Sequence, residues 1–67
     1  MSPMEAHQEL RHLVLMVSTG GIEDDFAKAK ALPLLEIINK RGKEIAKKHG
    51  KSYKPLTWGF AVRYGVK

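Results

Sequence analysis

Residues 33–50 read PLLEIINKRGKEIAKKHG, the most strongly patterned stretch of the chain. On a helix that turns about 100° per residue, its apolar side chains fall in one sector about 120° wide, and three of its lysines lie on the opposite side. Pro33 suits the first turn of such a helix, and Gly50 suits the position just after its last turn. The pattern therefore predicts an amphipathic helix over about 33–49.

Two further features of this helix are its possible ion pairs and a glycine in its middle. Glu36 and Glu44 stand four residues before Lys40 and Lys48, which is the spacing of helical ion pairs. Gly42 lies inside the apolar sector, although glycine in mid-helix costs about 1 kcal/mol against alanine. Close approach by another helix would explain it, and the alternative is a simple weak point in the middle of the helix.

Two further amphipathic segments precede this helix. Ser2 and Glu5 have the spacing of a capping box with a proline at the first helical position, and apolar residues follow at helical intervals. We expect a helix over about 3–17. A second helix over about 22–32 would carry three acidic residues in its first turn, where the helix dipole favours them, and would end at Pro33.

The apolar stripes of the three predicted helices must bury against one another. We therefore expect a mainly α-helical fold in which the stripes supply the core. The predicted core residues are Leu10, Leu13, Val14, Val17, Phe26, Leu34, Leu35, Ile38 and Ile45.

The C-terminal segment 56–66 has two interpretations. Apolar residues alternate with small or polar ones over all eleven positions, a pattern typical of a strand with one apolar face. A lone strand would have to pair across a homodimer, with the sheet edge of a partner or with the apolar run 13–17. The alternative is a short helix capped by Thr57. The alternation favours the strand slightly.

The size and composition of the chain limit the number of domains and the cellular locations that it can have. With 67 residues and no cysteine, residues 1–67 form a single small domain without a disulfide. The first residues lack the basic and apolar regions of a secretory signal. The longest apolar run, 13–17, is far shorter than the roughly 20 residues that span a membrane. We expect a cytoplasmic protein without a membrane segment.

The sequence offers little for catalysis, so we do not expect an enzyme. The carboxylates of residues 23–25 would point apart on a helix, and residues 18–21 lack the lysine of a phosphate-binding loop. His7 and His12 are five residues apart and share a helix face poorly. We expect no metal site and no cofactor.

Charge is unevenly distributed along the chain. Residues 1–39 carry six acidic and three basic residues, whereas residues 40–67 carry one acidic and nine basic residues. Such segregation suggests an anionic partner for the C-terminal half, although a lysine-rich surface can also serve solubility alone. The candidate residues for nucleic acid or an acidic protein surface are Lys40, Lys43, Lys47, Lys48, Lys51, Lys54 and Arg63.

Aromatic residues are interleaved with these cations. Trp58, Phe60 and Tyr64 are candidate partner-interface residues, because exposed rings can stack on bases or fill a partner's pocket. The alternative is that Trp58 and Phe60 belong to the core, since the chain has only five aromatic residues.

Two functions fit these features. The first is a small regulatory protein that binds nucleic acid through its basic C-terminal half, with a homodimer as a plausible arrangement. Residues 45–50 are similar in spacing to the first helix and turn of a helix-turn-helix, although Lys51 and Pro55 depart from that pattern. The second is an adaptor or inhibitor that docks on a larger enzyme or assembly.

Overall fold

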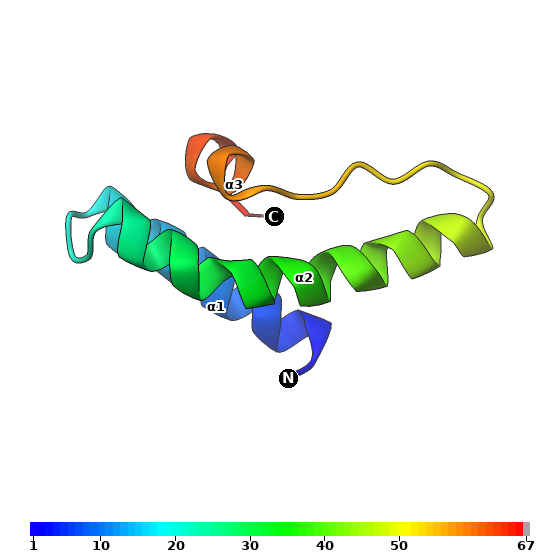
Figure 1. Ribbon diagram of the computed structural model, residues 1–67, viewed down its shortest axis with the longest axis horizontal. Coiled ribbons are helices and arrows are strands. Elements are labelled where there is room, and N and C mark those ends of the chain that lie inside the picture. Colours follow the sequence, from blue (N-terminus) through cyan, green and yellow to red (C-terminus); the bar gives the residue numbers. More distant parts are fainter. Residues whose placement is uncertain (67) are drawn as a thin grey trace.

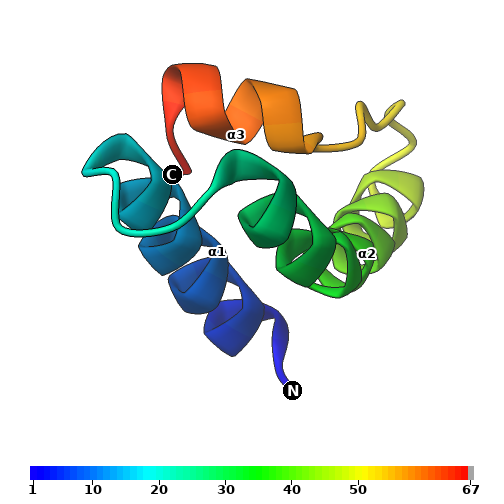
Figure 2. The ribbon, with the colours of Figure 1, turned by 60° about the vertical axis from the view of Figure 1, so that its left-hand side comes forward.

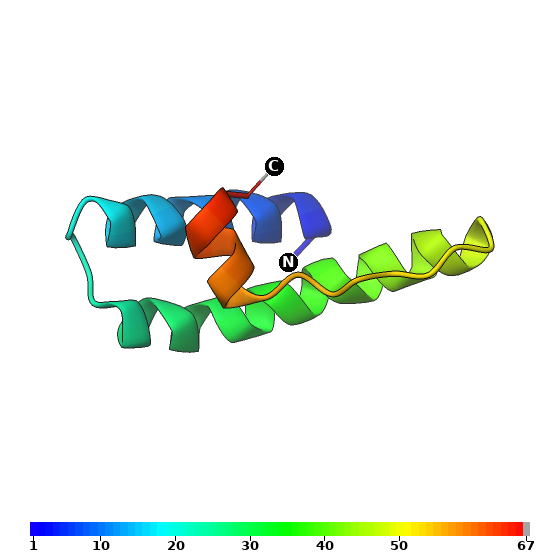
Figure 3. The same ribbon diagram turned by 90° about the horizontal axis from the view of Figure 1, so that it is seen from above.

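The computed structural model describes residues 1–66, which form three helices. They are α1 (Pro3–Ser18), α2 (Asp24–Lys48) and α3 (Trp58–Tyr64). α1 and α2 run antiparallel side by side, and α3 lies across both of them (Figures 1 and 3). The predicted mainly helical class is therefore confirmed.

α1 begins at the predicted capping box. The Glu5 backbone N–H donates to the Ser2 hydroxyl oxygen (3.2 Å), and the Ser2 backbone N–H donates to Glu5 Oε1 (3.3 Å). Pro3 occupies the first helical position, where its missing N–H costs nothing. The start of this helix is thus determined by local chemistry that is visible in the sequence.

α2 corrects the prediction of separate helices over 22–32 and 33–49, because one helix of 25 residues continues through Pro33. A proline inside a helix removes a backbone hydrogen bond and costs about 3 kcal/mol. Buried side chains on both sides of Pro33, from Ala27 to Ile38, pack in the same cluster and offset that cost. At about 1.5 Å per residue the helix is about 37 Å long, and it sets the 40 Å long axis of the molecule.

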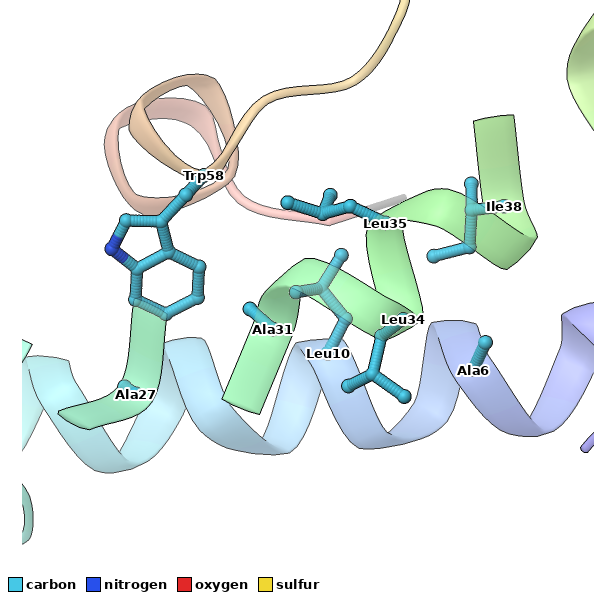
Figure 4. Packing of buried hydrophobic residues seen from close by; sticks show 8 residues of the cluster. All are labelled: Ala6, Leu10, Ala27, Ala31, Leu34, Leu35, Ile38 and Trp58. Atoms are coloured by element: carbon cyan, nitrogen blue, oxygen red, sulfur yellow. The ribbon is translucent and has the colours of Figure 1, made fainter. Parts of the chain in front are cut away.

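Small side chains allow α1 and α2 to approach closely. Ala6 on α1 and Ala27 and Ala31 on α2 are completely buried, as is Leu10 (Figure 4). The rest of the buried cluster comprises Leu34, Leu35, Ile38 and Trp58. Leu13, Val14 and Val17 are partly buried against it, so most of the predicted core lies where the sequence placed it.

The assignment of Phe26 and Ile45 to the core is wrong. Phe26 is 55% exposed, because the buried face of α2 passes through Ala27 and Ala31 instead, and the Lys30 ammonium lies 5.1 Å from the centre of its ring. Ile45 lies on the same side of α2 as the core but is 45% exposed. It belongs to the last part of α2, which extends beyond α1 (Figures 1 and 3).

The slightly favoured strand interpretation of segment 56–66 is wrong, and the alternative of a short helix is confirmed. Thr57 caps α3 by accepting a hydrogen bond from the Phe60 backbone N–H (3.2 Å). Trp58 and Ala61 of α3 are buried against the other helices. An isolated strand would leave its backbone polar groups unpaired, whereas a helix pairs them internally. The backbone therefore does not need a second copy or a partner sheet.

Across residues 1–66, none of the helices has both the length and the apolar character needed to cross a membrane.

Candidate functional site

Residues 51–57, which connect α2 to α3, are extended and return along α2. The side chain of Asn39 holds them there. Its Oδ1 accepts from the Leu56 backbone N–H (2.7 Å) and from the Tyr53 hydroxyl (2.7 Å), and its Nδ2 donates to the Leu56 carbonyl oxygen (3.0 Å). One amide thus satisfies both backbone groups of Leu56 and the Tyr53 hydroxyl. We call this set of contacts the Asn39 clasp.

The clasp also explains Gly42. A Cβ atom at this position would overlap the ring of Tyr53 and lie 2.7 Å from its hydroxyl oxygen. The sequence correctly indicated a close neighbour, but the neighbour is a tyrosine side chain from the connection and not another helix. Tyr53 therefore packs against α2 at Gly42 and lines the groove described below.

Six of the predicted cationic residues gather on one projecting part of the molecule. We call residues 40–54, the last part of α2 and the start of the connection, the cationic arm. The arm extends beyond α1 and α3, as Figures 1 and 3 both show. The exposed lysines on it are Lys40, Lys43, Lys47, Lys48, Lys51 and Lys54.

The lysines of the arm have few anionic neighbours. In the part of the chain that the structure describes, the one ion pair joins Arg41 Nη1 to Glu44 Oε2 at 3.6 Å, and both side chains are more than half exposed. The predicted pairs of Glu36 with Lys40 and of Glu44 with Lys48 do not form. The six lysines therefore carry charge that no side chain of residues 1–66 neutralises in an ion pair.

Arg63 lies apart from the arm. It belongs to the last turn of α3, which covers the other half of α2 (Figure 2). The sequence grouped Arg63 with the lysines because they follow one another along the chain, whereas the fold separates them.

An apolar groove is lined partly by the arm itself, through Gly42, Ile45 and Tyr53, on a different side of α2 from Lys40, Lys43 and Lys47. It has a volume of about 620 Å³ and is open to solvent along one side. Its main lining residues are Ile38, Ile45, Tyr53, Leu56, Phe60 and Tyr64. The rings of Phe60 and Tyr64 are tilted against each other with centroids 4.7 Å apart, and they are 54% and 63% exposed.

Trp58 is separated from these two rings. It is 6% exposed, and its indole Nε1–H donates to Asp24 Oδ1 in the first turn of α2 (3.0 Å). Of the three predicted interface aromatics, Phe60 and Tyr64 are on the surface, whereas Trp58 lies in the core. Asp24 also has a role that the sequence did not reveal, because it fixes the start of α3 to the start of α2.

The helix-turn-helix interpretation is wrong. The backbone N–H of Lys51 donates to the Ala46 carbonyl oxygen (2.8 Å), and Gly50 has a positive φ of 66°, so the predicted glycine makes the turn that follows α2. No second helix follows this turn directly. The chain is extended until Thr57, and α3 then packs back on the start of α2.

Among residues 1–66, no group of three or more acidic or histidine side chains lies close enough together to hold a metal ion.

No family model, curated protein or solved structure matches this chain.

Proposed function

We propose that this chain is a non-enzymatic binding protein that binds nucleic acid through the cationic arm. The observation that carries the proposal is the concentration of six exposed lysines on one projecting part of the molecule, without ion pairs among the described residues. Each lysine that contacts a phosphate displaces a condensed counterion, and this release drives association.

Lys40, Lys43 and Lys47 are the centre of the proposed contact surface. They are three to four residues apart on α2 and therefore share one face of the helix. Lys48, Lys51 and Lys54 extend the positive charge to the end of the arm. An ammonium group is a point charge without the planar fork of arginine, so these residues suit phosphate contacts better than base recognition. The proposed binding is therefore weakly sequence-specific.

The test is a fluorescence anisotropy titration of duplex and single-stranded DNA and RNA oligonucleotides at about 50 mM and about 200 mM salt. If four lysines contact phosphates of a duplex, affinity should fall about 150-fold between these concentrations. Replacement of Lys40, Lys43 and Lys47 by Gln should reduce the slope of log affinity against log salt by about one for each lysine in contact.

A control variant with the same net charge as the triple Gln variant can be made from basic residues outside the arm. Arg11, Lys28 and Lys30 are the three basic residues of the first 39 positions, they are exposed, and they lie outside the arm. The variant R11Q/K28Q/K30Q loses three positive charges as well and should keep most of the affinity. Equal losses in the two triple variants, or no binding by the wild-type chain at low salt, would reject the proposal.

A further inference from the structure

The positions of the aromatic rings bear on the form of nucleic acid that the arm can bind. Proteins that bind single strands combine cations with aromatic side chains on which unpaired bases stack, and each stacked base raises affinity about fivefold or more. The chain has five aromatic residues, and all of them lie within the described residues 1–66. Each ring can therefore be placed relative to Lys40, Lys43 and Lys47, which we call the lysine face of α2.

The two most exposed rings of the C-terminal half lie on the other side of α2 from the lysine face. Phe60 and Tyr64 line the apolar groove together with Ile45. Ile45 is two residues from both Lys43 and Lys47, so it points about 200° away from them around the helix. A strand that contacts these lysines cannot stack its bases on these rings at the same time.

The other three rings are covered or distant. Tyr53 lines the groove, and the Asn39 clasp holds its hydroxyl. Trp58 is buried in the core. Phe26 is exposed, but it precedes Lys40 by fourteen residues and so lies about 21 Å from it along α2. The lysine face therefore has cations and no aromatic ring on which a base could stack.

The arm also has few planar cations. Arginine can stack on bases because its guanidinium group is planar. Arg41 is the one arginine of residues 40–54, and its Nη1 is paired with Glu44 Oε2 at 3.6 Å. The six lysines have compact ammonium groups, which suit phosphate oxygens and offer no plane for a base. The arm is thus built to contact the charge of a nucleic acid and not its bases.

Without stacking, the density of phosphates decides which form is bound more tightly. A duplex carries one negative charge per about 1.7 Å of its axis, whereas each strand carries one per about 3.4 Å. Each phosphate contact releases about 0.9 of a counterion from a duplex and about 0.7 from a single strand. With four lysine contacts and equal affinities at about 1 M salt, the duplex is bound about tenfold more tightly at about 50 mM and about fourfold more tightly at about 200 mM.

We propose that the cationic arm selects double-stranded over single-stranded nucleic acid, with the lysine face laid along the phosphates of the duplex. This inference rests on the proposed function, and it adds the form of nucleic acid that the arm binds. The arm projects beyond α1 and α3, so a duplex can meet the lysine face without contact with those two helices (Figures 1 and 3).

The experiment uses the full chain and two labelled DNA probes with nearly the same number of phosphates. One is a duplex of about 20 base pairs, and the other is a single strand of about 40 nucleotides without self-complementary sequence. Fluorescence anisotropy should show the duplex bound about tenfold more tightly at about 50 mM salt, and about fourfold more tightly at about 200 mM. A single strand that binds as tightly as the duplex, or more tightly, overturns the proposal.

Removal of the groove rings tests whether they stack on bases. The double variant Phe60→Leu/Tyr64→Leu removes both rings and keeps apolar side chains at both positions. Both affinities should change less than about twofold, because neither ring stacks on a base. A selective loss of single-strand affinity would show that these rings serve the nucleic acid, and the proposal would then be wrong.

Addition of a ring to the lysine face is the converse test. Glu36 is exposed four residues before Lys40, and it lines a shallow hollow with Lys40 and Lys43. Glu36→Gln is the matched control for Glu36→Trp, since both remove the same charge. Relative to this control, Glu36→Trp should raise single-strand affinity about fivefold or more and change duplex affinity less than about twofold. Equal effects on the two probes would contradict the proposal, and circular dichroism checks that each variant is folded.

Failure of this proposal is distinguishable from failure of the proposed function. Equal binding of the two probes leaves phosphate contact by the arm in place and overturns only the selection of a duplex. Absence of binding to either probe at low salt overturns both, as do equal losses in the two triple variants described above.

Discussion

Replacement of Asn39 by Ala should detach the connection from α2 and destabilise the whole domain. The substitution removes three hydrogen bonds, one with the Tyr53 hydroxyl and two with the Leu56 backbone. At about 0.5–1.5 kcal/mol each, these bonds contribute about 1.5–4.5 kcal/mol. Alanine recovers about 0.6 kcal/mol through its better helix propensity. The expected net loss is about 1–4 kcal/mol.

A loss of this size is large for so small a protein. At about 0.05–0.15 kcal/mol per residue, a chain of 67 residues has a total stability of about 3–10 kcal/mol. Urea denaturation followed by tryptophan fluorescence measures the change, since Trp58 is the only tryptophan and is buried at the start of α3. With a slope of about 1–2 kcal/mol per molar, the midpoint should fall by about 0.5–4 M.

Two control variants make the measurement specific. Lys40→Ala changes the exposed neighbour of Asn39 on the same helix and should shift stability by less than about 0.5 kcal/mol. Tyr53→Phe removes one of the three bonds and should cost about 0.5–1.5 kcal/mol. If Asn39→Ala is as stable as Lys40→Ala, the clasp does not hold the connection and the reasoning is refuted.

Three further predictions concern the core and the helix ends. Ile38→Ala should cost about 2–5 kcal/mol, because Ile38 is only 6% exposed, and an unchanged melting temperature would contradict its place in the core. Trp58→Phe keeps an aromatic ring but loses the hydrogen bond to Asp24, so denaturation should show a loss of about 1–3 kcal/mol. Hydrogen bonds from the Ser2 side chain and backbone lower the pKa of Glu5, so its contribution to stability is complete above the unfolded pKa of about 4.3 and is lost as pH falls through the lower folded value. An NMR titration of the Glu5 carboxyl should show this lowered pKa, and Ser2→Ala should raise it.

The candidate surfaces were only partly visible in the sequence. The six lysines of the arm were predicted because they are exposed residues on, or just after, one amphipathic helix, and helical periodicity depends only on local spacing. The groove was not predicted, because its walls come from α2, the connection and α3. The one sequence feature that pointed to the groove was Ile45, an isoleucine on the apolar stripe of the helix. It was assigned to the core, whereas it is exposed and lines the groove.

Local chemistry determined the helix ends and faces. The capping box at Ser2, the turn at Gly50 and the alternation of apolar and charged faces along residues 34–48 involve contacts within a few residues, so the sequence alone predicts them. The same information also gave the mainly helical class.

Tertiary packing decided what local chemistry left open. α2 continues through Pro33 because burial of its flanking residues against α1 and α3 outweighs the local cost of a proline. Segment 56–66 has a strand-like alternation, yet residues 58–64 are helical because the helix satisfies its own backbone and places Trp58 and Ala61 in the core. Ile45 is exposed because it belongs to the last part of α2, which extends beyond α1. These outcomes depend on which segments far apart in the sequence pack against one another. The periodicity of apolar residues and the helix or strand preference of each residue do not determine those contacts.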